Sequence, residues 1–284
     1  MTDVQGSVVL VTGASSGIGR VTARRFAARG AKVMAVARRE ALLRRLVEDC
    51  HADSPESAYM AGDLGERPFA EQVVDRTVAR YGRLDVLVNN AAVSKHKQIY
   101  HMSADEAEAV MRVNFLSCVW TTLAAIPYML RQGGGTIVNV SSFAAKVAPP
   151  REAIYAASKA AMNAFSEGLW NDLAGSDIHV AIVNPGPIDT EIWDKEDEPV
   201  AYDGKKHPPD IVTDAIFRAI ATRRHEVTVP RWSPQLITAR ILRLIFPSLL
   251  RFGMARTDPV PQDVVDRARA RARSGKRLGD LDAT

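Results

Sequence analysis

Short apolar runs alternate with longer amphipathic segments along most of the chain. The runs are continuous in Val and Ile rather than alternating with polar residues, as in strands buried on both faces of a sheet. Strands are expected at residues 7–12, 32–37, 57–62, 84–90, 136–142, 178–185 and 226–230. Helices are expected between them, at residues 17–29, 39–50, 66–81, 103–131, 152–173 and 209–222. Repeated strand–helix–strand units predict a doubly wound α/β fold, with helices on both faces of one parallel sheet.

Two regions follow from this pattern. Residues 1–230 contain no linker-like interruption and are predicted to form a single domain, while residues 231–284 form a C-terminal helical extension. In residues 232–256, apolar positions at helical spacing share the segment with four arginines and no acidic residue, and Pro247 should kink or divide the helix. The stretch 266–284 lacks apolar residues at useful spacing and is expected to be a mobile tail.

The arginine-rich segment 232–256 has three open interpretations. It could lie on an anionic membrane surface, because its apolar and basic positions separate at helical spacing. It could instead cover the substrate cleft or contact another subunit, or it could pack against its own domain.

Composition narrows the class of protein. With 284 residues, 46% hydrophobic and 25% charged, the chain is typical of globular proteins. The formal net charge of +4 is small and the basic residues are scattered, so no nucleic-acid binding is expected. Cys50 and Cys118 are far apart and are expected to be reduced thiols. Without a leader-like start or a long apolar run, the expectation is a cytoplasmic protein, with membrane association left open.

A glycine-rich stretch, TGASSGIG, follows the first expected strand and carries Gly13, Gly17 and Gly19. A strand that runs into such a turn and opens a helix directs backbone N–H groups and the positive end of the helix dipole towards an anion. The spacing is therefore compatible with a pyrophosphate site. A structural turn without a ligand could have the same spacing, so the loop alone does not decide.

The end of the second strand bears on which dinucleotide would bind. An acidic residue there would bind the ribose 2′-OH of NAD, whereas an arginine accommodates the 2′-phosphate of NADP. The chain has Ala37 at this point, followed by Arg38 and Arg39, with no acid beside Arg38. These residues favour NADP(H) over NAD(H), with Arg38 the stronger candidate. The alternative is a solvated arginine pair at the start of a helix.

Tyr155 and Lys159 are four residues apart in an expected helix, so both side chains leave the same face. A neighbouring ammonium favours the phenolate and would lower the tyrosine pKa from about 10 towards neutrality. Ser142 ends the strand just upstream, where a hydroxyl could bind an oxygen that gains charge during a reaction. Taken alone, the Tyr–Lys pair would more simply be a surface pair.

Taken together and in this order, the motifs resemble those of the short-chain dehydrogenase/reductase family, from residue 7 to about residue 190. The matching segments are TGASSGIG (12–19), GDL (62–64), NNAA (89–92), Asn114, the set Ser142, Tyr155 and Lys159, and NPGPIDT (184–190). Two positions depart from the family pattern, since Ala92 and Ala145 stand where glycine is usual. An alanine that needed a positive φ would strain the backbone by about 1 kcal/mol or more.

The resemblance implies a Rossmann-like domain that binds NADP(H) and a set of residues for it. Cofactor contacts are expected from Gly13, Ser15, Ser16, Gly17, Ile18, Gly19, Arg38, Arg39, Asp63, Leu64, Asn90, Ala91, Tyr155, Lys159, Pro185, Gly186, Ile188 and Thr190. Tyr155 would exchange a proton with the substrate oxygen, Lys159 would lower the tyrosine pKa and bind the nicotinamide ribose, and Ser142 would polarise the oxygen. Asn114 would either position a water next to Lys159 or make a structural hydrogen bond.

The expected function is therefore interconversion of a ketone or aldehyde and an alcohol in a small-molecule substrate. A non-catalytic NADP(H)-binding sensor or scaffold is one alternative, and an epimerase or dehydratase on the same fold is another. The alanine-rich helix around Tyr155 favours a homodimer or homotetramer. Lys95, His96 and Lys97 either steer an anionic substrate or form a solvated loop, and no histidine has metal-ligand spacing.

Overall fold

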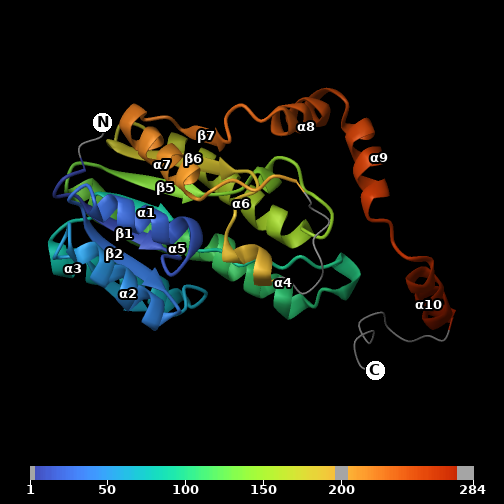
Figure 1. Ribbon diagram of the computed structural model, residues 1–284, viewed down its shortest axis with the longest axis horizontal. Helices are drawn as coiled ribbons and strands as arrows, with labels where there is room; N and C mark the ends of the chain where they lie inside the picture. The colour runs from blue at the N-terminus through green and yellow to red at the C-terminus, as the bar shows by residue number, and fades with distance from the viewer. Residues whose placement is uncertain (1–3, 196–203, 274–284) are drawn as a thin grey trace.

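A computed structural model describes residues 4–195 and 204–273 of the protein. Seven parallel strands form one sheet in the order β3-β2-β1-β4-β5-β6-β7 (Figure 1). The strands are β1 Val8–Thr12, β2 Lys32–Ala37, β3 Ala58–Ala61, β4 Val86–Asn89, β5 Gly135–Val140, β6 Ile178–Pro185 and β7 Glu226–Val229. Each lies within two residues of the expected run, and the doubly wound topology is confirmed.

Helices cover both faces of the sheet, as expected. They are α1 Gly17–Ala27, α2 Glu40–His51, α3 Arg67–Tyr81, α4 Ala104–Met111, α5 Ser117–Arg131, α6 Ala153–Asp172 and α7 Asp210–Thr222. One core cluster joins α1, α2 and α7 to the sheet, and Phe26 packs on Phe217 there with ring centroids 4.6 Å apart. A second cluster joins α3, α5 and α6 to the opposite face. The clusters hold the sheet rigid between two helical layers.

The single helix expected at residues 103–131 is interrupted. A π-helical turn, η2 (Arg112–Leu116), separates α4 from α5. The run Ala104–Arg131 is long and apolar enough to cross a membrane, the one such run among the described residues. Its segments contact α3, α6 and strands β4 and β5, so it belongs to the packing of the domain. Cys118 on this run and Cys50 on α2 are both free and buried.

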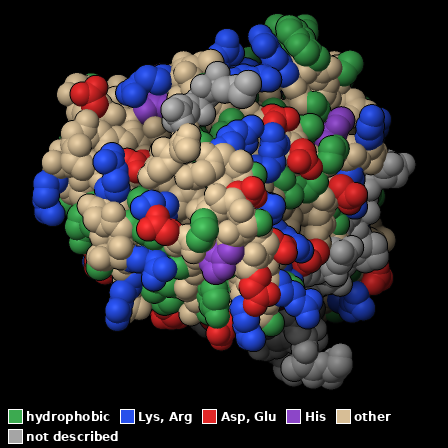
Figure 2. All heavy atoms as spheres, turned by 60° about the vertical axis from the view of Figure 1, so that its left-hand side comes forward, with side chains coloured by type: hydrophobic (Ala, Val, Ile, Leu, Met, Phe, Trp, Pro, Cys, Tyr) green, Lys and Arg blue, Asp and Glu red, His purple; other side chains and the backbone are tan. Residues whose placement is uncertain are grey.

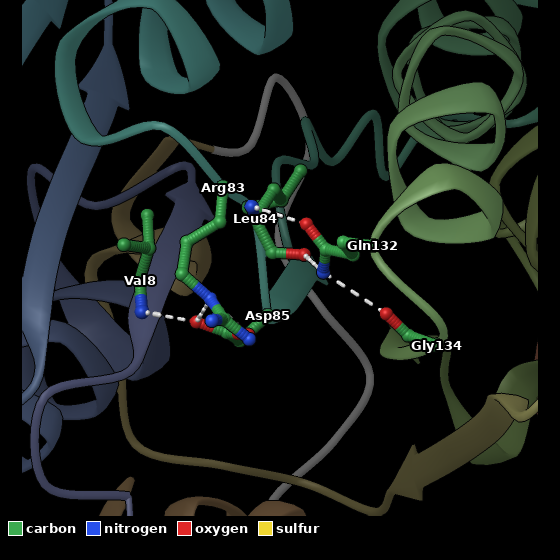
Figure 3. Close-up of polar contacts among 6 residues, drawn as sticks. All are labelled: Val8, Arg83, Leu84, Asp85, Gln132 and Gly134. Atoms are coloured by element: carbon green, nitrogen blue, oxygen red, sulfur yellow. Dashed lines mark hydrogen bonds and ion pairs between the residues drawn. The ribbon is translucent and has the colours of Figure 1, made fainter.

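Polar side chains fix the amino-terminal ends of the central strands, where β4 begins (Figure 3). The Asp85 carboxylate accepts a hydrogen bond of 2.8 Å from the backbone N–H of Val8, at the start of β1. The Gln132 side chain accepts from the N–H of Leu84 at 3.1 Å and donates to the carbonyls of Leu84 and Gly134. These bonds hold β1, β4 and the turn before β5 in register. The loops that build a site gather at the opposite, carboxyl-terminal ends of the strands.

Neither departure from the family's glycine pattern strains the backbone. The described non-glycine residues with positive φ are Arg151, Asp177 and Arg223. Ala92 and Ala145 are not among them, so alanine is accommodated at both positions without a left-handed conformation.

Three helices follow the domain: α8 Pro234–Ile245, α9 Pro247–Thr257 and α10 Gln262–Arg273. The chain divides at Pro247, as expected from the sequence. Residues 266–273 of the expected mobile tail belong to the helix α10, which the sequence pattern did not predict. Alternating alanines and ion pairs such as Arg267–Asp263, 2.8 Å apart at helical spacing, favour the helix. Residues 274–284 lie outside the described part of the chain.

Candidate active site

A cleft of about 740 Å³ opens at the carboxyl ends of the strands. Its walls come from the loops after β1 to β6 and from α4 and α6, the usual position of a ligand in a doubly wound sheet. The predicted residues that line it are Gly13, Ser15, Ser16, Gly17, Ile18, Arg38, Arg39, Asp63, Leu64, Asn90, Ala91, Tyr155, Lys159 and Thr190. Gly19, Asn114, Ser142, Pro185, Gly186 and Ile188 are not part of this wall.

The three glycines of the first loop are required by contacts within the chain itself. A Cβ on Gly13 would stand 2.8 Å from the Cα of Ala91, and one on Gly19 would collide with the carbonyl of Gly13. A Cβ on Gly17 would stand 3.0 Å from a carbon of Thr190. Gly13 and Gly17 also have positive φ. The glycines let the loop pack against its neighbours and thereby aim the start of α1.

The start of α1 is suited to an anion. Ser16 at its N-cap makes no side-chain capping bond, and the first turn contains no acidic residue. Gly17 and Ile18 of that turn line the cleft. The first N–H groups of a helix have no intrahelical partner, and the helix dipole is positive there. The residues present therefore fit a pyrophosphate, the anionic centre of a nicotinamide dinucleotide.

Arg38 and Arg39 have different partners. Arg39 donates to the hydroxyls of Ser15 and Ser16 and forms an ion pair of 2.7 Å with Glu191. Glu191 comes from the short helix η4 (Glu191–Lys195), far from the arginine pair in the sequence, so no local pattern could predict this carboxylate there. Arg38 is exposed, and no carboxylate among the described residues pairs with it. Arg38 is thus an exposed cation on the wall of the cleft.

Lys159 lies on α6, one turn after Tyr155, and is 1% exposed. Its Nζ donates a hydrogen bond of 2.9 Å to the carbonyl of Val140 and lies 6.0 Å from the centre of the Tyr155 ring. Burial lowers the pKa of Lys159 to about 8. The ammonium is therefore held at the floor of the cleft rather than against the phenol oxygen.

Tyr155 lines the cleft, and its ring is half-buried. Burial is the largest cause that raises its pKa, the negative charge of Glu152 raises it further, and a hydrogen bond with Ser142 lowers it. The cost of burying a phenolate therefore sets the direction of the shift in the protein alone, and the lowering of the Tyr155 pKa by Lys159 stays a prediction. In this state Tyr155 is a neutral phenol that carries its proton but holds it more tightly than an ordinary tyrosine.

Asn114 is fully buried in η2 and its amide is used by the protein. Its oxygen accepts from the N–H of Val93 at 2.8 Å, and its nitrogen donates to the Val93 carbonyl and the Ser158 hydroxyl. Ser158 in turn donates to the carbonyl of Tyr155 at 2.7 Å. Of the two expectations for Asn114, these contacts fit the structural hydrogen bond. They connect the loop after β4 to the turn that carries Tyr155.

Lys95 and Lys97 do not belong to a solvated loop. Both ammonium groups contact Glu106 on α4, at 3.4 and 3.2 Å. The backbone N–H of Ser103 is the main cause that lowers the pKa of Glu106 to about 2, and both lysines lower it further. The interpretation of a solvated loop is wrong here, and Lys95 also lines the cleft.

The sequence analysis missed a contact among His96, Glu152 and Trp193. His96 is buried, lies 2.6 Å from a carboxylate oxygen of Glu152, and stacks on Trp193 with ring centroids 5.7 Å apart. These residues lie far apart in the sequence, so no local spacing could reveal them. Among the described residues, no group of three or more His, Cys, Asp and Glu is placed to hold a metal ion.

The segment after β6 packs more deeply than expected. The N–H of Gly186 donates 2.6 Å to the carbonyl of Val229, and Ile188 is buried in the core. The Ile188 carbonyl accepts from the indole N–H of Trp193 at 2.6 Å. Thr190 continues from this segment and reaches the cleft beside Gly17.

Comparisons with known proteins agree with this geometry. A family model described as short chain dehydrogenase matches residues 7–201. A dehydrogenase/reductase SDR family protein 7-like of Drosophila melanogaster is 34% identical over 266 residues, covering 88% of this chain and 80% of that protein. The 11-beta-hydroxysteroid dehydrogenase 1A of Arabidopsis thaliana is 41% identical over 192 residues, covering 67% of this chain and 54% of that protein.

A solved structure gives the same result at the level of the fold. A short chain dehydrogenase/reductase from Burkholderia phymatum, in complex with NAD, superposes with a TM-score of 0.80 at 27% identity, covering 92% of this chain and all of that one. The family model covers more than half of the chain, and the strand order and cleft are those expected for such a protein. The chain is a member of the short-chain dehydrogenase/reductase family, an oxidoreductase on a Rossmann-like fold.

Proposed function

We propose that this chain binds NADP(H) and interconverts a ketone or aldehyde with an alcohol in a small-molecule substrate. The observation that carries the proposal is the arrangement around Tyr155. Its phenol faces the cleft beside Ser142, one helical turn from the buried Lys159, and the glycine loop forms another wall of the same cleft. A protein that only bound the dinucleotide would not need a phenol with a serine partner there.

The residues present would hold the dinucleotide along the whole cleft. The first turn of α1 receives the pyrophosphate, Arg38 the 2′-phosphate, and Asp63 and Leu64 the adenine end. Lys159, Asn90 and Thr190 lie towards the nicotinamide end. When bound, the cofactor supplies or accepts the hydride, and the protein supplies orientation and a proton.

Tyr155 is the proton donor in the direction of reduction. Burial keeps its phenol protonated, and the Ser142 hydroxyl partly offsets the cost of the phenolate that forms when the proton leaves. The ammonium of Lys159, 6.0 Å from the ring, also favours that phenolate. Ser142 would additionally donate to the substrate oxygen as negative charge develops on it. In the reverse direction the phenolate takes the proton of the alcohol.

The variant Tyr155→Phe tests the proposal. It removes the hydroxyl and keeps the ring, so turnover should fall by about 100- to 10 000-fold, the usual contribution of a positioned acid or base. Binding of NADPH, measured by its fluorescence, should change little. Candidate ketones and aldehydes are followed by NADPH absorbance, with NADH in parallel.

Three results would contradict the proposal. Unchanged turnover in the Phe variant would remove Tyr155 from the chemistry. Product formation without any net change in nicotinamide absorbance would indicate an epimerase or dehydratase on the same fold. A chain that binds NADPH but turns over no carbonyl or alcohol would be a sensor or scaffold.

We also propose that the protein assembles into a homodimer or homotetramer through α6. Ala153, Ala157, Ala160 and Ala164 recur every three or four residues and are exposed on this helix. Small side chains allow two helices to approach closely. An interface there would be built on the helix that carries Tyr155 and Lys159.

A further inference from the structure

The segment 231–258, which contains α8 and α9 and is called the C-terminal arm here, has little of the domain around it. No residue of α8 is buried, and the principal contacts of α8 and α9 are with each other. Figure 1 shows α8, α9 and α10 following one another beyond the domain. The arm therefore exposes faces that a helix of the domain would bury.

The exposed face of the arm is strongly apolar. Along α8, Ile237, Ile241 and Leu244 form a stripe at helical spacing and are 41%, 47% and 73% exposed. Ile245, Phe246, Leu249 and Phe252 continue the exposed set into α9, each more than half exposed. Monomeric globular proteins rarely expose so many large apolar side chains together unless a partner covers them.

The charge of the same segment has a single sign. Residues 232–256 contain Arg240, Arg243, Arg251 and Arg256 and no acidic residue. The guanidinium of Arg256 lies over the Phe252 ring, 3.8 Å from its centre, so basic and apolar groups share the surface. By contrast, Figure 2 shows a face of the protein on which basic and acidic side chains are interspersed.

The arm contacts the domain at two points, one near each of its ends. Leu236 of α8 packs against Gly186, with its Cδ1 3.1 Å from where a Cβ on that glycine would stand. Asp258, just after α9, accepts two hydrogen bonds from Arg151, of 2.7 and 2.9 Å, and one from Gln98. These contacts fix both ends of the arm in a position that leaves its apolar stripe exposed.

We propose that the C-terminal arm docks on the surface of an anionic lipid bilayer. Its apolar stripe enters the boundary between headgroups and acyl chains, and its arginines meet anionic headgroups, as in amphipathic helices that lie in the membrane plane. A second copy of the arm is the less suitable partner, because it would bring arginines against arginines. The proposal does not depend on the reaction at Tyr155.

Co-sedimentation of the full chain with vesicles tests this docking. Vesicles of phosphatidylcholine with phosphatidylserine should recover the protein, and vesicles of phosphatidylcholine alone should recover less. The variant Leu244→Glu places a charge on an exposed position and should weaken binding about tenfold or more. Arg240→Gln and Arg251→Gln should each weaken it about fivefold on the anionic vesicles only.

A matched control is Leu130→Glu, which makes the same change at a half-exposed position of α5 and should bind like the parent chain. Circular dichroism confirms that each variant is folded. Equal recovery of the parent and Leu244→Glu chains would overturn the proposal. The proposal would also be overturned if Leu244→Glu abolished self-association of the protein while recovery with vesicles stayed the same. The stripe would then be covered by a second copy.

Discussion

Neighbouring residues with the same side chain can have different roles, as the arginines after β2 illustrate. Arg39 is held by Ser15, Ser16 and Glu191, so its guanidinium is fixed beside the glycine loop. Arg38 is exposed at the cleft. A sequence that reads Arg-Arg cannot separate these roles, because the carboxylate that engages one of them arrives from η4.

The variant Arg38→Ala is expected to weaken NADPH binding about 10- to 100-fold, the loss of charge-assisted hydrogen bonds to a phosphate. NADH lacks that phosphate, so its binding should change little. Titrations of both cofactors by fluorescence measure the two affinities. An equal loss for both cofactors, or none for either, would remove Arg38 from 2′-phosphate recognition.

His179 on β6 offers a test of stability far from the chemistry. It is 2% exposed, and its Nε2 has no hydrogen-bond partner among the described residues. Burial, and then the charges of Arg223 and His225, lower the pKa of His179 to about 4. The unfolded chain binds this proton near pH 6.5, so the free energy of unfolding should fall as the pH drops from about 6.5 to 4.

Denaturant unfolding between pH 8 and pH 4 measures this effect. A single proton gives a slope of at most about 1.4 kcal/mol per pH unit, added to that of the other groups. The variant His179→Gln cannot take up the proton, so its stability should fall less steeply below pH 6.5. Parallel curves for the parent and variant chains would show that His179 is not responsible.

At the scale of elements, the strands were predictable because burial on both faces leaves a simple signature. The run 178–185 is mainly apolar, with His179 and Asn184 as its polar residues, and β6 occupies the whole of that run. The break at η2 was not predictable, because Arg112–Leu116 keeps a helical pattern of apolar residues. Within this turn Asn114 is held between the loop after β4 and α6, by contacts with residues far from it in the sequence.

The candidate site likewise contains some features that the sequence could predict and others that it could not. Tyr155 and Lys159 lie on one helix and the glycines in one loop, so their spacing in the sequence is nearly their spacing in space. Glu152, His96 and Trp193 meet only after the loop after β4 and η4 fold over α6. Local pattern therefore found the residues held by one element. It missed the contacts that several elements make together.

For the whole molecule, the exposed alanines of α6 make the assembly testable. The variant Ala164→Glu places a carboxylate at the C-terminal end of the small-residue stripe, where two copies would meet. Its charge would face its own copy across a symmetric interface, so the assembly should dissociate. Size-exclusion chromatography with light scattering should give multiples of 31.0 kDa for the parent chain and 31.0 kDa for the variant.

Ala221→Glu is the matched control, since Ala221 is an exposed alanine near the end of α7, on the opposite face of the sheet. The control should keep the mass of the parent chain, because the interface is expected on α6. A parent chain of 31.0 kDa at every concentration would refute the assembly outright. An oligomer that survives Ala164→Glu but dissociates in Leu244→Glu would place the interface on the C-terminal arm and contradict both the α6 interface and the membrane contact.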